Sequence, residues 1–285
     1  MITRSMPWYE FAPGTIEIDE FDCASIFLFL GNKRALLLDT GTGIGDLKGL
    51  VESITSLPYD VVLTHGHLDH VGGCGWFPEV YINEKELSLD PFSVTAEKRK
   101  WYAEVIRTRE HKNYAYDMDR DIREWPAKPA IKMLTDGQEF DLGGRVLTFY
   151  ECPGHCPGEM VMIDDQTRIL FSGDAVNNNL LFQKKPGDPG FVSVEDGGKY
   201  LERIYKMQDR FDHVMNSHHD FRGLGAPLAD SVLPNAIQCC KDLAAGCADV
   251  REMEDALRPG HRVPIATVDG KSWVAFTPEG IRGRL

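Results

Sequence analysis

The order of apolar and polar positions predicts strands and a helix in the first part of the chain. Apolar runs at residues 26–30 and 35–38 flank residues 31–34, whose composition (GNKR) is typical of a turn between paired strands. Residues 46–56 carry apolar side chains at helical spacing, and another apolar run follows at residues 61–63. Strands that alternate with a helix in this way indicate an α/β fold.

The pattern changes between residues 84 and 128. Charged, aromatic and helix-forming residues dominate this segment and no strand signal is present, so we expect a helical insertion. Its aromatic side chains could form a lid over a functional site or could simply pack the insertion together. These aromatic residues are Trp101, Tyr102, Tyr114, Tyr116 and Trp125.

Strand and turn signals return after the insertion. Residues 132–144 and 146–150 are expected to form a hairpin that turns at residues 141–144, and a short strand is expected at residues 168–171. Residues 177–192, rich in Asn, Gly, Pro and Lys, are predicted to form a loop that is long enough to be functional. The remaining predicted elements are a helix that starts with a capping box at Ser193 and Asp196, a strand at 213–216, a helix at 233–249 and a closing hairpin at 263–276.

A short motif directly after the apolar run at 61–63 concentrates metal-binding groups. The segment His65-Gly66-His67-Leu68-Asp69-His70 holds three imidazoles and a carboxylate within six residues. Open α/β sheets gather their ligand-binding groups in loops at the carboxyl ends of strands. His65 and His67 can converge on one ion, while Asp69 and His70 can point at a second. The motif therefore predicts a metal site, and favours one with two ions.

Five segments in order resemble the signature motifs of the metallo-β-lactamase-fold hydrolases. That superfamily also contains the glyoxalase II thioesterases, the quorum-signal lactonases and several nucleases. The resemblance runs from about residue 26 to residue 220 and implies a four-layer αββα sandwich of two mixed sheets, as one domain over residues 1–285. The matching segments are 36–41 (LLLDTG), 64–73 (THGHLDHVGG), 153–159 (PGHCPGE), 171–175 (FSGDA) and 217–218 (SH).

The same resemblance implies seven metal ligands shared by two divalent ions. Zn²⁺ is the expected metal, with Fe and Mn as alternatives. Three imidazoles would bind the first ion, a carboxylate and two imidazoles the second, and a further carboxylate would bridge them. Some β-lactam-cleaving relatives use a cysteine at the bridging position, so a carboxylate there points away from antibiotic cleavage. In that order, the implied ligands are His65, His67 and His155; Asp69, His70 and His218; and Asp174.

Several assignments stay open. His219 adjoins His218 and could replace it as the last ligand. Cys156 could compete as a thiolate ligand, but in an extended segment its side chain should point away from that of His155, so a packed thiol is expected. Asp39 could fix the metal loop by hydrogen bonding or could simply form a turn.

The sequence gives weaker indications of a functional role for other polar residues. One of the asparagines at residues 177–179 could donate a hydrogen bond to an oxyanion. His111, His213 and His261 lie outside every motif and are expected on the surface or in packing positions.

The expected reaction is hydrolysis of an ester, thioester or lactone. Two ions lower the pKa of a bridging water toward neutrality and so generate a hydroxide nucleophile. Asp69 would orient this nucleophile and carry a proton to the leaving group, which makes it the candidate catalytic residue. Three alternatives stay open: iron-dependent oxidation of the kind catalysed by persulfide dioxygenases, phosphodiester cleavage, and a sensor that binds metal without catalysis.

Composition and charge limit the classes of substrate and binding partner that we expect. The formal net charge of −13 repels a phosphate backbone, so we expect a neutral or small acyl substrate and no nucleic acid. No apolar run is long enough to cross a membrane, and the first eleven residues lack the apolar core of a secretory signal, so a cytoplasmic location is expected. Seven cysteines, an odd number, favour reduced thiols over a disulfide framework. The sequence leaves a homodimer open.

Overall fold

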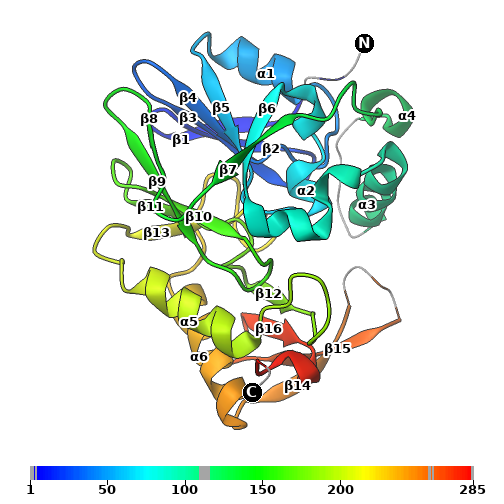
Figure 1. Ribbon diagram of the computed structural model, residues 1–285, viewed down its shortest axis with the longest axis vertical. Helices are drawn as coiled ribbons and strands as arrows, with labels where there is room; N and C mark the ends of the chain where they lie inside the picture. Colours follow the sequence, from blue (N-terminus) through cyan, green and yellow to red (C-terminus); the bar gives the residue numbers. More distant parts are fainter. Residues whose placement is uncertain (1–2, 4, 109–115, 256–257, 259, 284–285) are drawn as a thin grey trace.

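The first sheet occupies the upper part of Figure 1 and contains seven strands in sequential order. The computed structural model describes residues 3, 5–108, 116–255, 258 and 260–283. The first four strands are antiparallel and the last four are parallel, with the fourth strand common to both groups. The strands are β1 (Trp8–Ala12), β2 (Thr15–Asp19), β3 (Ser25–Leu30), β4 (Ala35–Leu38), β5 (Tyr59–Val62), β6 (Glu79–Asn83) and β7 (Ala130–Leu134).

The second sheet has five strands in the order β13-β11-β10-β9-β8. The hairpin predicted from residue 132 onward is only partly right, because β7 pairs with β6 in the first sheet and the hairpin itself begins at β8. The strands are β8 (Glu139–Asp141), β9 (Val146–Glu151), β10 (Met160–Asp164), β11 (Ile169–Phe171) and β13 (His213–Met215).

The two sheets pack face to face through a core of aromatic and aliphatic side chains. The ring of Phe171 lies edge-on against Phe27 and Phe29, with centroids 4.9 and 4.8 Å apart. These rings are fully buried and join strands from both sheets. The contact is the centre of the sandwich.

Helices cover the outer faces of both sheets. Apolar side chains of α1 and α3 pack against the first sheet, and those of α5 and α6 pack against the second. The expected αββα sandwich is therefore confirmed. The helices are α1 (Leu47–Ile54), α2 (Leu68–Val71), α3 (Ala96–Thr108), α4 (Met118–Asp121), α5 (Val194–Tyr205) and α6 (Val232–Ala245).

A third sheet, in the lower part of Figure 1, was not predicted. Its order is β12-β16-β15-β14, with strands β12 (Asn179–Phe182), β14 (Val250–Glu254), β15 (Arg262–Ala266) and β16 (Trp273–Phe276). β12 interrupts the predicted loop at residues 177–192, because it finds a parallel partner in the distant β16. The predicted helix at 233–249 stops early because Gly246, at φ +73°, ends α6 in a left-handed conformation. The closing hairpin of β15 and β16 and the capping box at Ser193 are confirmed.

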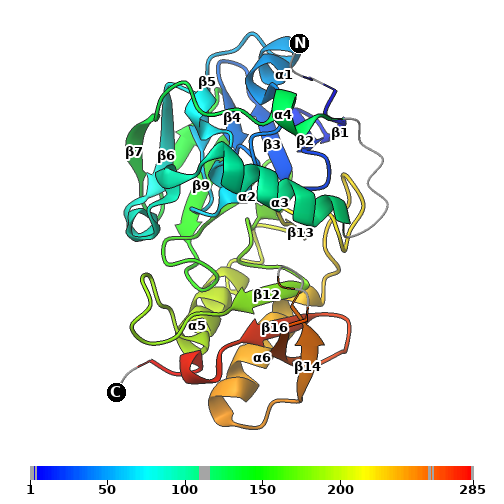
Figure 2. The same cartoon turned by 90° about the vertical axis from the view of Figure 1, so that its right-hand side faces the viewer.

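The described part of the insertion is helical. It contains α3, α4 and two 3₁₀ segments at Glu84–Leu89 and Pro91–Ser93. Residues 109–115, including His111 and Tyr114, lie outside the described residues. Figures 1 and 2 both place α3 just above the third sheet, beside the short helix α2.

Two further expectations concern the whole chain. All seven cysteines are free, and six of them are buried. Within the described residues, the structure contains no helix with the length and apolarity that a membrane span requires.

Candidate metal centre

The first metal-binding motif forms a bend between β5 and α2. The backbone N–H of Thr64 donates to Oδ1 of Asp39 at 2.7 Å, and His67 stands at the N-cap of α2. Glu86 connects this bend to the second motif, since its carboxylate accepts the N–H of Gly66 at 2.7 Å and that of Gly158 at 2.6 Å. A buried carboxyl from the insertion thus holds two metal loops at a fixed separation.

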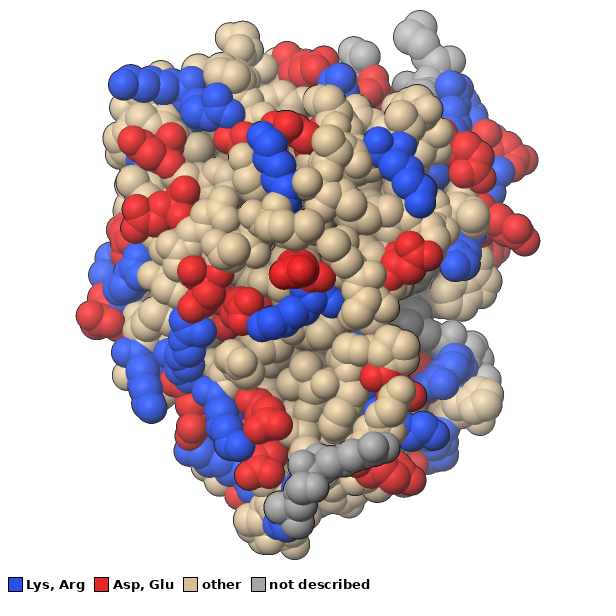
Figure 3. Space-filling model, in the orientation of Figure 1, with Lys and Arg blue, Asp and Glu red and all other residues tan. Residues whose placement is uncertain are grey.

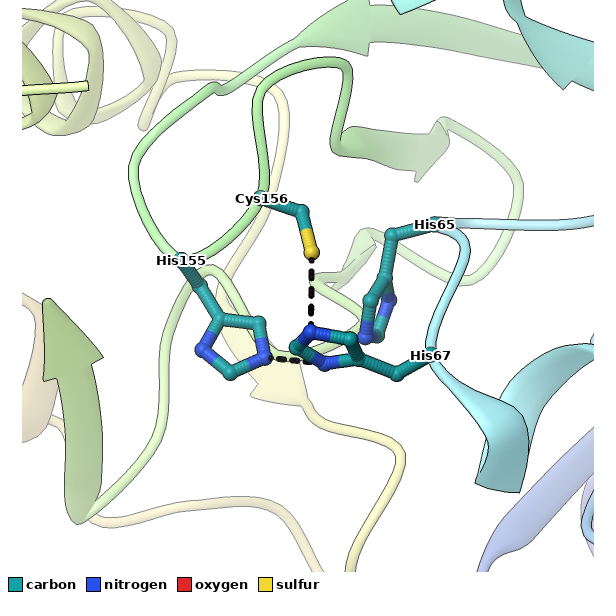
Figure 4. A group of neighbouring side chains, drawn as sticks. All are labelled: His65, His67, His155 and Cys156. Atoms are coloured by element: carbon teal, nitrogen blue, oxygen red, sulfur yellow. Dashed lines mark hydrogen bonds between the residues drawn. The ribbon is translucent and has the colours of Figure 1, made fainter. Parts of the chain in front are cut away.

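Three imidazoles form the first group, which we call the imidazole cluster: His65, His67 and His155 (Figure 4). Nδ1 of His67 lies 2.9 Å from Nε2 of His155, and Nε2 of His65 is buried without a hydrogen-bond partner among the described residues. Burial and the neighbouring imidazoles lower the pKa of all three, that of His67 to about 3. The three rings are therefore neutral, and a neutral imidazole can bind a metal ion through its unprotonated nitrogen.

The side chain of Cys156 also reaches this cluster. The expectation that it points away from the His155 side chain in an extended segment is therefore wrong. The chain is not extended at this point: it bends, with the N–H of Gly154 donating to the carbonyl of Cys156, and the thiol sulfur lies 3.4 Å from Nε2 of His67 (Figure 4). Nδ1 of the same ring faces His155, so the two nitrogens of His67 have different partners, although the sulfur and one nitrogen from each of the three imidazoles all lie within 4.8 Å of one another. Cys156 is thus a buried thiol that contacts the outer nitrogen of His67.

The second group, the carboxylate cluster, consists of Asp69, His70 and His218. Oδ1 of Asp69 lies 3.8 Å from Nε2 of His70, and Oδ2 lies 3.5 Å from Nε2 of His218. Although burial opposes protonation, the surrounding carboxylates raise the pKa of His70 to about 10 and that of His218 to about 9. The excess negative charge of this cluster attracts a cation.

Asp174 stands between the two clusters. Its Oδ2 lies 3.4 Å from Nε2 of His218, 3.8 Å from that of His70 and 3.7 Å from that of His155. Its backbone N–H donates to Glu159 at 2.7 Å, and its Oδ1 is buried without a partner among the described residues. Asp174 therefore contacts imidazoles of both clusters.

The outer nitrogens of four of the imidazoles already have partners. A metal ligand of this type usually engages its second nitrogen in a hydrogen bond, which fixes the tautomer and the ring orientation. The inner nitrogens of His65 and His70 and one oxygen of Asp174 are left without partners, which fits divalent ions that accept imidazole and carboxylate ligands. The outer partners are the Thr64 hydroxyl for His65, the Cys156 thiol for His67, the Leu181 carbonyl for His155 and the Asp39 carboxylate for His70.

The structure brings all seven implied ligand residues together and places His219 elsewhere. Nε2 of His219 lies 2.9 Å from Oδ1 of Asp22, and its Nδ1 lies 3.1 Å from the Ser25 hydroxyl. His218, not His219, therefore faces Asp174. His213 and His261 are exposed, as expected.

A cavity of about 410 Å³ opens onto both clusters. One wall carries Trp101, Tyr102 and Ile106 of α3, and the third sheet contributes further apolar side chains. Of the three asparagines considered above, Asn177 and Asn179 line the cavity, whereas Asn178 donates to the carbonyl of Lys271. The cavity is thus lined by groups of both clusters, by apolar side chains and by charged residues that include Lys184 and Glu254.

Sequence reasoning named Tyr102 only as an aromatic residue of a possible lid, and it gave no role to Glu86 or Glu159. Tyr102 donates its hydroxyl to Oδ2 of Asp69 at 2.5 Å, and Glu86 and Glu159 hold backbone N–H groups of the metal loops. Glu159 ends the matching segment at 153–159, but the segment gave it no role. No sequence spacing indicates Tyr102 or Glu86, because both come from the insertion.

Comparison with known proteins agrees with this geometry. The family model of the metallo-beta-lactamase superfamily matches residues 18–190. The chain belongs to that superfamily. Members of the metallo-beta-lactamase superfamily bind divalent metals, and this chain carries His and Asp groups that could hold them. The recognition made from the motifs is confirmed, and the protein is a hydrolase.

Two curated relatives of this superfamily member are named as thioesterases. The human acyl-coenzyme A thioesterase MBLAC2 is 30% identical over 238 residues, which cover 76% of this chain and 81% of the relative. The atrochrysone carboxyl ACP thioesterase of Claviceps purpurea is 25% identical, over 72% of this chain and 51% of the relative.

A solved structure shares the fold. The stereoselective inverting sec-alkylsulfatase Pisa1 from Pseudomonas sp. superposes with a TM-score of 0.59 at 15% identity, covering 85% of this chain. The chain spans only 42% of the sulfatase, so this likeness concerns the fold alone.

Proposed function

We propose that the protein hydrolyses an acyl thioester or ester at a centre of two divalent ions, most simply Zn²⁺. The observation that carries the proposal is the position of Asp174, whose Oδ2 lies 3.4 to 3.8 Å from imidazoles of both clusters. The thioesterase names of the relatives support the choice of a thioester. In this proposal the imidazole cluster would hold one ion, the carboxylate cluster would hold the other, and Asp174 would be shared by both.

The bound ions would supply a hydroxide at neutral pH and polarise the substrate carbonyl. The protein's own groups then orient the reaction. Asp69 lines the cavity, so its carboxylate can orient the nucleophile, take up a proton from it and pass that proton to the leaving thiolate or alkoxide. The hydrogen bond from Tyr102 restricts where this carboxylate points.

The cavity favours a small acyl substrate over a nucleic acid. Trp101, Ile106 and Val263 give it an apolar surface for an acyl group. On the face shown in Figure 3, basic and acidic side chains are interspersed and form no continuous basic groove. Together with the net charge of −13, this distribution disfavours a polyanionic phosphodiester.

A substrate panel tests the function. The Zn²⁺-loaded protein is mixed with acyl-coenzyme A thioesters, lactones, a β-lactam and a phosphodiester, and released thiol or acid is measured. We expect thioester hydrolysis that a chelator abolishes and Zn²⁺ restores. Phosphodiester cleavage alone, or iron in the protein from its native host together with oxygen uptake, would contradict the proposal.

A further inference from the structure

The hydroxyl of Tyr102 reaches from the insertion to a proposed metal ligand. It donates to Oδ2 of Asp69 at 2.5 Å, and the Tyr102 side chain is 7% exposed. A phenol is protonated at neutral pH, so it acts as the donor and the carboxylate as the acceptor. The contact joins residues 33 positions apart in the sequence.

The helix that carries Tyr102 is fixed to the loops around the centre. Arg99, one turn earlier on α3, is completely buried and donates to the carbonyls of Gly43 and Arg123. Trp125, further along the insertion, donates its ring N–H to the carbonyl of Gly72 at 2.7 Å. The described part of the insertion is therefore anchored to the loop that follows the first metal motif.

The contact limits the orientation of Asp69. The same Oδ2 that accepts from Tyr102 lies 3.5 Å from Nε2 of His218, while Oδ1 lies on the side of His70. Without the phenol, the Asp69 carboxylate would lose the one hydrogen bond among the described residues that restrains rotation of its side chain. A short, buried hydrogen bond to a carboxylate is strong enough to select one rotamer.

We propose that Tyr102 is a positioning residue that holds Asp69 in the orientation required for metal binding and proton transfer. This inference rests on the proposed function. It means that the insertion supplies a residue that orients a metal ligand. A purely structural tyrosine would contribute through its ring, whereas a positioning residue acts through its hydroxyl.

The test removes only that hydroxyl. In Tyr102→Phe the ring stays in place, and Tyr116→Phe is the matched control, because Tyr116 lies in the same insertion and its ring is tilted by 37° against that of Phe21, with centroids 4.9 Å apart. Metal-free proteins are titrated with Co²⁺ and followed by visible absorption, and kcat and KM are measured on a thioester. We expect Tyr102→Phe to weaken the binding of one Co²⁺ and to lower kcat, each by about 10- to 100-fold, with little change in KM.

A double-mutant cycle separates positioning from folding. In an Asp69→Ala background, Tyr102→Phe should have no further effect on Co²⁺ binding, because the group it holds is gone. Wild-type Co²⁺ affinity and kcat in a folded Tyr102→Phe protein would overturn the inference, as would equal losses in both backgrounds. Because Co²⁺ affinity is measured without substrate, it stays informative even if the protein hydrolyses no thioester.

Discussion

The two halves of the centre differ in charge although both are rich in histidine. In the imidazole cluster, burial lowers the pKa of every ring, that of His67 to about 3. In the carboxylate cluster burial acts in the same direction, but Asp39, Asp69 and Asp174 outweigh it and raise the pKa of His70 to about 10. The difference shows that neighbouring carboxylates, and not burial alone, determine the pKa and therefore the charge of an imidazole at this site.

This contrast gives the two proposed ions different surroundings. The three neutral imidazoles add no negative charge to the first ion, so apart from the shared Asp174 its charge is not offset, which favours a role in acidifying water and polarising a carbonyl. Carboxylates offset part of the charge of the second ion, so it is suited to holding Asp69 and a leaving group. Substitutions that act on one cluster, on both or on neither can test this division.

The largest effect is expected from the residue shared by both clusters. Asp174→Ala removes the carboxylate that lies within 3.8 Å of His70, His155 and His218. We expect the metal content to drop from two ions toward one and turnover to be abolished, as measured by elemental analysis and thioester hydrolysis. Full activity with two bound ions would refute the bridging role.

Adjacent histidines allow the carboxylate cluster to be broken alone. His218→Ala should lose the second ion and most of the activity, because His218 faces Asp69 and Asp174. His219→Ala should keep both ions. It should lower the free energy of unfolding by about 1 to 3 kcal/mol, since it removes the imidazole that contacts both Asp22 and Ser25.

Metal analysis and thermal unfolding of both variants provide the measurement. Loss of an ion in His219→Ala, together with its retention in His218→Ala, would reverse the assignment of the last ligand.

A smaller effect is expected from the outer partner of the carboxylate cluster. Asp39 accepts from Nδ1 of His70 at 2.9 Å and from the backbone of Thr64 at 2.7 Å. Asp39→Asn is compatible with the local backbone, because Asn tolerates the φ of +64° found there. Its side-chain amide has only one oxygen, so it can no longer accept hydrogen bonds from both the His70 ring and the Thr64 backbone. We expect the second ion to bind about 10- to 100-fold more weakly while the first is unchanged, as measured by competition with a chelator. Equal weakening of both ions would show that Asp39 supports the whole loop instead.

The sequence predicted the centre better than its surroundings for a physical reason. His65, His155 and Asp174 each follow a short strand within a local motif, so spacing and strand position suffice to place them. Tyr102 approaches Asp69 only because α3 docks on the loop after α2, and β12 exists only because it pairs with β16, nearly a hundred residues later. Such contacts depend on tertiary packing, which no local pattern encodes.

The smallest effect is expected from the outer partner of the imidazole cluster. The Cys156 sulfur lies 3.4 Å from Nε2 of His67, and a thiol is a weaker hydrogen-bond partner than the carboxylate of Asp39. Removing it with Cys156→Ala frees the ring to exchange tautomers, so the first ion should bind about tenfold more weakly. Cys156→Ser should restore the affinity, because a hydroxyl can take the same hydrogen bond.

Cys152→Ala is the matched control, since Cys152 is an equally buried thiol at the end of β9 that belongs to the apolar core behind the second sheet. Chelator competition gives the affinities, and nitrogen NMR of the metal-free protein reports the tautomer of His67. If Cys156→Ala and Cys152→Ala weakened the first ion equally, loss of packing would explain the effect and the thiol would have no part in orienting His67. If Cys156→Ala instead removed the first ion altogether while the tautomer stayed fixed, the sulfur would be a ligand, and the imidazole cluster would no longer be the neutral half of the centre.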